Sequence, residues 1–330
     1  MKFLNNCAYE RIMQVKILFM GTPDFAETCL DALIKAGKNV VGVITQPDKK
    51  QGRGMKVAFC DVKKYAIEQG LEVYQPESLR DGAISGLLEK LSPDIIVVVA
   101  YGKILPQYVL DFPKYGCVNV HGSLLPAYRG AAPIQRAVIN GDACTGITTM
   151  FMAAGMDTGD ILLTERVPIG ENTTTGELFD TLAECGGRLL VKTLEKIESG
   201  KITRIKQDDN LATYAEKISN EECLINFSSD AKSVHNRIRG LSPFPGAFAY
   251  LDGKIVKLYD SVCNKDESYD GIPGKVIRAD AKSGVTVGCL NGTVTIRSFK
   301  PEGKGLLSAA DMINGRKIAV GSVFSSDSVK

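Results

Sequence analysis

A strand, a helix and a second strand follow one another near the start of the chain, and this order constrains the fold most. Residues 15–20 and 40–45 are mostly apolar, while residues 25–36 carry apolar side chains at helical spacing before Gly37. Parallel strands need a long crossover connection, which is usually a helix. Two strands joined by a helix of this length therefore favour parallel pairing. The opening therefore predicts an α/β fold with a Rossmann-like, mostly parallel sheet.

The turn after the first strand argues against a dinucleotide cofactor. Gly21 is followed by Thr22 and Pro23, so the glycine-rich cradle G-x-G-x-x-G that approaches a pyrophosphate is missing. The fold class is thus predicted without nicotinamide binding.

Two later strand patterns define where a site is expected. Residues 95–100 form the most apolar segment and predict a central strand covered on both faces. Residues 116–121 predict another buried strand, which presents Asn119 and His121 on the same face at its carboxyl end. Ligands bind at that end in open α/β sheets, so the loop with Tyr101 and Gly102 is expected to help form the site.

Asn119, His121 and the later Asp157 form a set suited to acyl transfer. An amide can donate to the oxygen of an attacked carbonyl, an imidazole can act as a cation or proton donor, and a carboxylate can keep that imidazole charged. Singly, each has a plainer interpretation: a strand-end turn former, a structural histidine and a turn cap between Gly155 and Gly159.

The run N-V-H-G-S-L-L-P-A-Y-R-G-A-A-P from Asn119 to Pro133, followed by Asp157, resembles the formyltransferases that use 10-formyltetrahydrofolate. The similarity extends from about Met13 to near the end of the chain. It implies that Asn119, His121 and Asp157 are catalytic. The residues expected to bind the folate are Ser123, Leu124, Leu125 and Pro126, together with Tyr101 and Gly102.

A basic segment indicates a further partner. Between residues 49 and 64, six cations face a single Asp61: Lys49, Lys50, Arg53, Lys56, Lys63 and Lys64. A solvated surface loop would look the same, although clustered cations also suit phosphates. The resemblance implies that an inserted loop approaches a tRNA acceptor stem here, with Arg53 as its matching arginine. We therefore predict tRNA contacts from Arg53, Lys49, Lys50 and Lys56.

The pattern of predicted elements changes after residue 200. A helix is predicted over 229–239, followed by short alternating strands at 247–251, 255–259, 274–279, 284–289 and 293–299. Such a series predicts a smaller OB-like β-barrel, a shape often used to hold nucleic acid. We interpret 1–12 as an N-terminal extension, 13–200 as the catalytic domain, 201–219 as a linker and 220–330 as a tRNA-binding domain. His235, beside Arg237, is expected to be surface-exposed or RNA-facing.

The remaining features favour a cytoplasmic enzyme without a metal. No apolar run reaches the roughly 18–20 residues that span a bilayer, and residues 1–12 lack an apolar signal core. The nine cysteines are odd in number and without metal-ligand spacing, which predicts reduced thiols. Cys117 is expected to be a buried strand residue. We also expect a monomer.

The resemblance implies transfer of the formyl group of 10-formyltetrahydrofolate to the α-amino group of methionine on initiator tRNA. One alternative is a formyltransferase for a small amine, such as glycinamide ribonucleotide or an amino-sugar nucleotide. Others are a hydrolase that releases formate and a non-catalytic RNA-binding protein. The basic segment and second domain argue against a small substrate, and the intact Asn119, His121 and Asp157 set argues against a lost activity.

Overall fold

The computed structural model describes residues 14–51 and 56–327. Two compact units are distinguished. The first unit runs to His121 and takes in Thr149–Gly155 and Gly186–Ile205, and the second comprises Gly122–Thr148, Met156–Cys185 and the described residues from Lys206 onward. Both units are therefore built from segments that lie far apart in the sequence.

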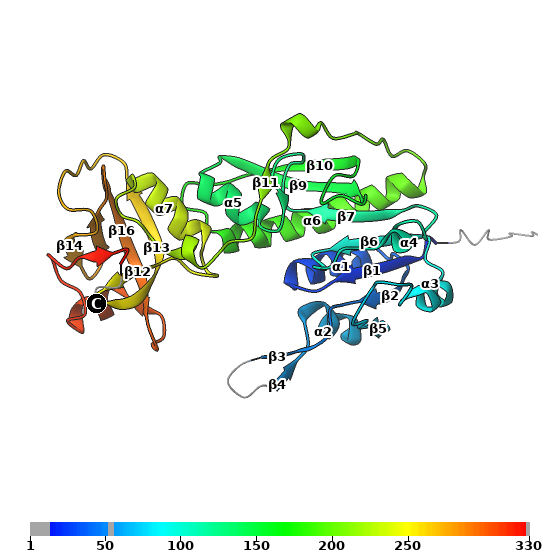
Figure 1. The fold of residues 1–330 in the computed structure, drawn as a ribbon, viewed down its shortest axis with the longest axis horizontal. Helices are drawn as coiled ribbons and strands as arrows, with labels where there is room; N and C mark the ends of the chain where they lie inside the picture. The colour runs from blue at the N-terminus through cyan, green and yellow to red at the C-terminus, as the bar shows by residue number, and fades with distance from the viewer. Residues whose placement is uncertain (1–13, 52–55, 328–330) are drawn as a thin grey trace, which may run out of the picture. The chain divides into compact units, whose positions relative to one another are not determined.

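The first unit contains most of a twisted parallel sheet (Figure 1). Its strands are β1 (Ile17–Gly21), β2 (Val40–Ile44), β5 (Val73–Tyr74), β6 (Ile95–Val99) and β7 (Cys117–His121). All five residues of β6 are buried, as their apolar run predicted, and β6 pairs in parallel with β1 and β7. The complete strand order is β10-β9-β7-β6-β1-β2-β5.

Short helices connect these strands: α1 (Asp24–Lys35), α2 (Asp61–Glu68), α3 (Ser85–Leu91) and α4 (Gln107–Leu110). In α1 the buried side chains include Phe25, Cys29 and Leu33, which are spaced four residues apart and therefore share one face. Asp24 in its first turn and Lys35 in its last complement the helix dipole. The predicted strand–helix–strand opening is confirmed.

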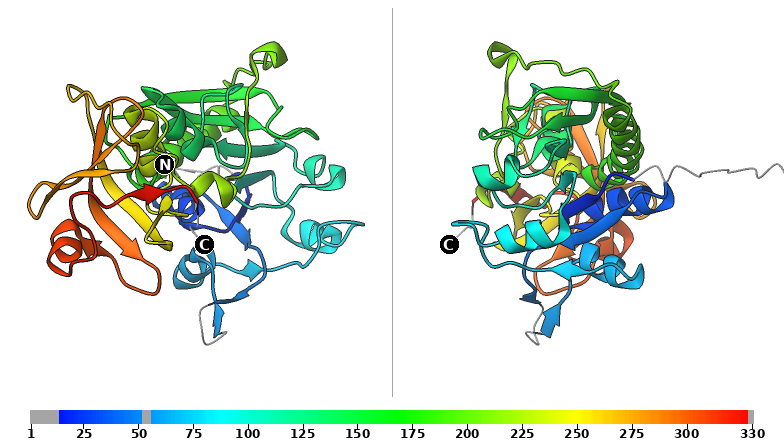
Figure 2. Two further views of the ribbon diagram at one scale, coloured as in Figure 1. Left: turned by 60° about the vertical axis from the view of Figure 1, so that its left-hand side comes forward. Right: turned by 90° about the vertical axis from the view of Figure 1, so that its right-hand side faces the viewer.

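The basic segment forms a hairpin instead of an irregular loop. Strands β3 (Lys49–Gln51) and β4 (Lys56–Ala58) pair antiparallel, with Lys49 opposite Ala58. Both views in Figure 2 show this hairpin extending away from the neighbouring α2. Lys49, Lys50 and Lys56 thus lie on paired strands, whereas Lys63 and Lys64 lie on α2.

The second unit begins with the segment after β7. Two elements here were not expected from the sequence: α5 (Pro133–Asn140), which starts with a proline at its first position, and β8 (Arg129–Gly130). β8 pairs in parallel with β11 (Tyr214–Ala215). Strand β9 (Cys144–Phe151) and helix α6 (Thr175–Glu198) begin in this unit and end in the first, and β10 (Ile161–Pro168) lies within this unit.

The later part of the second unit is a curled antiparallel sheet with the order β14-β15-β16-β13-β12-β18 (Figure 1). Its strands are β12 (Phe248–Leu251), β13 (Lys254–Asn264), β14 (Val276–Asp280), β15 (Gly284–Gly288), β16 (Thr293–Pro301), β17 (Leu307–Ser308) and β18 (Phe324–Ser325). The β12–β13 turn has positive φ at Asp252 and Gly253, as a tight hairpin requires.

Hydrogen bonds between the two ends close this sheet into a ring. The Phe324 amide donates to Gly274 at 2.8 Å, and the Val276 amide donates to Ser322 at 2.8 Å. Gly274 has φ +84°, and a Cβ there would lie 2.1 Å from the Phe324 carbonyl oxygen, so the closure requires glycine. The predicted fold class, a Rossmann-like domain followed by a smaller barrel-like domain, is confirmed.

Two helices pack on the barrel, and two short 3₁₀ turns precede it. Helix α7 (Ala231–Gly240) is capped by Asp230, and α8 (Ala309–Asn314) by a reciprocal Ser308–Asp311 box. The 3₁₀ turns are η1 (Asp209–Leu211) and η2 (Glu221–Cys223). Among residues 14–51 and 56–327, no helix is both long enough and apolar enough to cross a bilayer.

Candidate active site

Asn119 and His121 lie on β7, as the alternation predicted. Asn119 is half-buried and pairs in register with Val98 of β6, while His121 ends the strand with 6% of its surface exposed. Because side chains repeat every two residues along a strand, both project from the same face. The amide and the imidazole therefore stand at the carboxyl end of a parallel strand.

Tyr101 and Gly102 follow the neighbouring strand β6 and lie at the same edge of the sheet. The Tyr101 carbonyl oxygen accepts hydrogen bonds from Gln46 Nε2 at 2.8 Å and from Thr22 Oγ1 at 3.4 Å. Gly102 has φ +80°, and a Cβ there would lie 2.6 Å from Gln46 Nε2. Glycine is thus required for Gln46 to hold the loop.

The Tyr101 side chain is buried among apolar residues of the first unit. Its hydroxyl has no hydrogen-bond partner among the residues that the structure describes, and burial raises the pKa of this phenol to about 12. The hydroxyl therefore stays protonated at neutral pH, and the side chain contributes mainly to packing.

The Ser123–Pro126 stretch in the second unit is a hydrogen-bonded loop. Ser123 Oγ donates to the Ala127 carbonyl at 2.6 Å. Thr148 on β9 is fully buried: its hydroxyl donates to the Ser123 carbonyl at 2.7 Å and accepts from the Leu125 amide at 3.1 Å. The Ser123 hydroxyl and Thr148 thus fix the loop backbone, leaving Leu124 and Pro126 partly exposed.

Asp157 lies in a turn of the second unit with φ +53°, a left-handed conformation that is uncommon for residues other than glycine. Its Oδ2 accepts the Gly130 amide at 2.8 Å. Its carbonyl oxygen, and that of Gly159, each accept a hydrogen bond of 2.7 Å from Gln207 Nε2. The carboxylate and its backbone are therefore both held from outside the turn.

Arg129 is the buried anchor of this arrangement, with 2% of its surface exposed. Its Nε and Nη2 donate to Gln207 Oε1 at 3.1 and 2.8 Å, and Nη2 also lies 2.8 Å from Asp209 Oδ1. Arg129 lies within the motif from Asn119 to Pro133, but the sequence predicts no role for it, nor for Thr148, Gln207 and Gln46. No local pattern marks those three, because their partners lie far away in the sequence.

The predicted tRNA residues are only partly visible. Lys49, Lys50 and Lys56 lie on the β3–β4 hairpin, whereas Arg53 lies outside the described residues. Lys63, from the same basic segment, instead contacts Asp48 at 2.6 Å and lies 3.9 Å from the centre of the Phe59 ring. The charge of Lys63 is therefore paired within the protein.

The expectation that His235 is exposed is wrong. Its exposed fraction is 4%, its Nδ1 lies 2.8 Å from Ser261 Oγ, and its Nε2 lies 3.0 Å from the Glu171 carbonyl. Burial lowers the pKa of this imidazole. The α7 face that carries His235 packs inward because β13, which contains Ser261, lies against it. The expectation for Cys117 is confirmed: it is buried, and burial raises its pKa to about 12.

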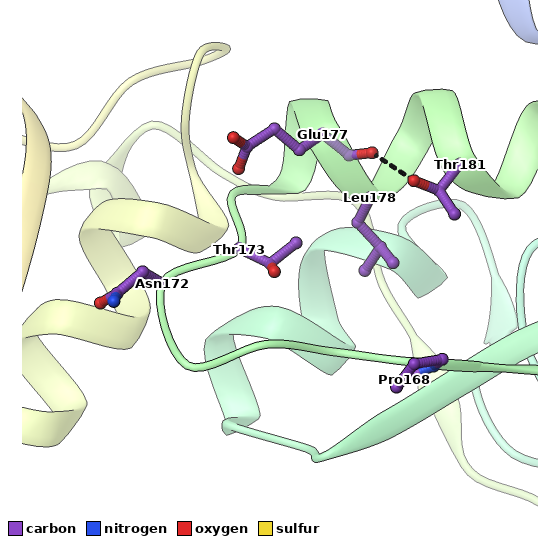
Figure 3. Close-up of a pocket in the computed structure, with 6 residues that line it drawn as sticks. All are labelled: Pro168, Asn172, Thr173, Glu177, Leu178 and Thr181. Atoms are coloured by element: carbon purple, nitrogen blue, oxygen red, sulfur yellow. Dashed lines mark hydrogen bonds between the residues drawn. The ribbon is translucent and has the colours of Figure 1, made fainter.

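Two pockets in the second unit are lined by none of the predicted catalytic or folate-binding residues. The pocket in Figure 3 has a volume of about 480 Å³ and lies beside the start of α6, where Thr181 Oγ1 donates to the Glu177 carbonyl at 3.0 Å. A second pocket of about 680 Å³ is lined partly by His235 and Arg239. Arg239 donates there to the Gly170 and Thr173 carbonyls, so its guanidinium connects α7 to the segment between β10 and α6.

The structure thus sorts the candidate residues into two groups. Asn119, His121, Tyr101 and Gly102 lie at the carboxyl edge of the sheet in the first unit. The Ser123–Pro126 loop and Asp157 lie in the second unit, where Gly130 joins Asp157 to the segment that follows the loop.

Comparison with known proteins defines the class. Residues 13–194 match the formyl transferase family, and residues 217–317 match the formyl transferase C-terminal domain. The chain belongs to the formyl transferase family and is a formyltransferase.

Individual relatives are similar over nearly their whole length. The chain is 45% identical to the methionyl-tRNA formyltransferase of Geotalea uraniireducens over 94% of this chain and 97% of that protein. It is 46% identical to the methionyl-tRNA formyltransferase of Clostridium novyi over 94% of this chain and 99% of that protein.

Solved structures share the fold at low identity. HypX from Aquifex aeolicus in complex with tetrahydrofolic acid aligns with a TM-score of 0.63 at 18% identity, over 92% of this chain and 48% of that chain. An N-formyltransferase from Helicobacter canadensis aligns with a TM-score of 0.61 at 20% identity, over 86% of this chain and 98% of that chain.

Proposed function

We propose that this chain transfers the formyl group of 10-formyltetrahydrofolate to the α-amino group of methionine on initiator tRNA. The amine nitrogen bonds to the formyl carbon, the bond from that carbon to N10 of the folate breaks, and the proton that the amine loses balances the one that the leaving nitrogen gains. Support for this acceptor comes from the relatives of 45% and 46% identity, whose names specify methionyl-tRNA.

The placement of Asn119 and His121 on one face at the end of β7 carries the chemical assignment. Attack by the amine converts the formyl oxygen into an oxyanion, which needs donors aimed at it. The Asn119 side-chain amide is the first donor, and His121 acts as a cation beside the oxyanion or as the proton donor to the leaving nitrogen. A single donor of this kind contributes roughly 3–4 kcal/mol to the transition state.

Asp157 is the third catalytic group in this proposal. Its carboxylate relays the proton that the attacking amine loses. The Gly130 amide bound to Asp157 Oδ2 fits this role, because it holds the carboxylate in one orientation.

The folate is assigned to the Ser123–Pro126 loop together with Tyr101 and Gly102. Partly exposed Leu124 and Pro126 offer apolar surface of the kind that an aromatic pteridine ring requires. Because the Ser123 hydroxyl and Thr148 are used to fix the loop, Ser123 acts through the shape of the backbone.

The tRNA is assigned to the β3–β4 hairpin and the C-terminal barrel. Lys49, Lys50, Lys56 and Arg53 supply the positive charge that phosphates require. The proposed domain division is 13–200 for catalysis, 201–219 for the linker and 220–330 for tRNA binding, after an extension at 1–12. We further propose that the protein acts in the cytoplasm as a monomer.

The decisive assay offers 10-formyltetrahydrofolate with three acceptors in parallel: initiator Met-tRNA, elongator Met-tRNA and glycinamide ribonucleotide. We expect rapid formylation of the initiator only. Activity confined to the small amine would keep the catalytic assignment and reject the RNA acceptor. Formate release without transfer to any acceptor would identify a hydrolase.

A further inference from the structure

Gln207 connects the buried Arg129 with the turn that carries Asp157. Only 6% of the Gln207 surface is exposed, and its side-chain amide makes four hydrogen bonds. Two of them come from the Arg129 guanidinium, and two go to the Asp157 and Gly159 carbonyl oxygens. This residue lies in the segment that the sequence suggested to be a linker.

The orientation of the amide follows from its partners. A guanidinium can only donate, and a carbonyl oxygen can only accept. The amide oxygen of Gln207 must therefore face Arg129, and its NH₂ group must face the Asp157 turn. Because each partner excludes the flipped arrangement, glutamine is the side chain that satisfies both sides at once.

A second contact holds the side chain of the same aspartate. The Gly130 amide donates to Asp157 Oδ2 at 2.8 Å, directly after Arg129 in the chain. Gly130 is itself fixed by its pairing with Ala215, and a Cβ at Gly130 would lie 2.8 Å from the Ala215 carbonyl oxygen. Gln207, which is bound by Arg129, thus holds the backbone of Asp157, and Gly130 holds its carboxylate.

We propose that Gln207 is a positioning residue for formyl transfer, because it holds the Asp157 turn in its left-handed conformation. Without its NH₂ group, two carbonyl oxygens lose their donor and the turn can relax away from φ +53°. The carboxylate then shifts relative to the reacting atoms. This inference rests on the proposed catalytic role of Asp157.

The variant Gln207→Glu isolates the NH₂ contacts. The carboxylate keeps an oxygen for Arg129 and nearly the same volume, but its second oxygen faces the Asp157 and Gly159 carbonyls and cannot donate when ionised. We expect kcat to fall by about 100-fold, as for a displacement of about 1 Å at a reacting centre, with KM for both substrates nearly unchanged. Gln207→Ala, which also removes the Arg129 contact, should lose at least as much.

Asn210→Asp is the matched control. It makes the same amide-to-carboxylate change three residues away, at an exposed residue whose backbone amide and side-chain Nδ2 both donate to Asp208 Oδ1. We expect wild-type kcat and KM from this control. A melting curve of each variant gives its folded fraction, and a Gln207→Glu loss of kcat that merely follows a loss of folded protein would overturn the inference.

A double-mutant comparison distinguishes positioning from general support. If Gln207 acts through Asp157, then Asp157→Asn combined with Gln207→Glu should be no slower than Asp157→Asn alone. A further loss of about 100-fold in the double variant would overturn the inference. If Asp157→Asn is inactive and Gln207→Glu is fully active, the positioning role of Gln207 is rejected and the catalytic role of Asp157 stands. If Asp157→Asn is fully active, the proposed catalytic role of Asp157 itself is rejected.

Discussion

Thr148 offers a sharp test of how the Ser123–Pro126 loop is held. Its buried hydroxyl donates to the Ser123 carbonyl at 2.7 Å and accepts from the Leu125 amide at 3.1 Å. Thr148→Val keeps the shape of the side chain but leaves both backbone groups without this partner. An unsatisfied buried polar group costs about 1–3 kcal/mol, so two of them cost about 2–6 kcal/mol. The added methyl group offsets about 1 kcal/mol of this, so the variant should lose about 1–5 kcal/mol.

Thr148→Ser is the matched control, because it keeps the hydroxyl and removes only a methyl group, at a cost of about 1 kcal/mol. For a unit of this size, each 1 kcal/mol shifts Tm by about 2–4 °C. Differential scanning fluorimetry should therefore rank wild type above Thr148→Ser and place Thr148→Val lowest, with a raised KM for the folate. If the valine variant melts at or above the serine variant, the two hydrogen bonds do not hold the loop.

Three further predictions concern chemistry, RNA and pH. Asn119→Ala and His121→Ala should each lower kcat by about 10²–10³ while circular dichroism stays unchanged; wild-type turnover in either would reject its role. Arg53→Ala should weaken tRNA binding and reduce the slope of log K against log salt by about 1, without changing folate affinity; an unchanged slope would remove this arginine from the interface. Burial lowers the pKa of His235, so the unfolded chain binds more protons than the folded one as pH falls below about 6.5, and folding stability should drop there. His235→Gln should remove that part of the pH dependence of Tm between about pH 7.5 and 5.5, and identical profiles would contradict it.

Local patterns in the sequence were sufficient for the elements around the site. The β7 strand could be predicted because alternation every two residues is a property of the strand itself, and that alternation put Asn119 and His121 on one face. The buried β6 strand followed for the same reason: an apolar run acts on its immediate neighbours.

The helix after the motif shows where local reasoning failed. The segment from Pro133 to Asn140 is α5, a helix that was not predicted from the sequence. Its proline stands at the first helical position, where no intrahelical hydrogen bond is lost. The buried His235 was missed because which face of α7 becomes covered depends on β13, a strand that begins fourteen residues beyond Gly240.

By itself, the sequence determined the fold class, the strand that carries Asn119 and His121, and the likeness to the formyltransferases. Tertiary structure alone decided how Asp157 is held: Arg129, Gln207 and the aspartate turn lie as many as 78 residues apart in the chain. Strand and helix periodicity reflects forces between near neighbours, whereas a buried hydrogen-bond network exists only once folding has removed water from its members.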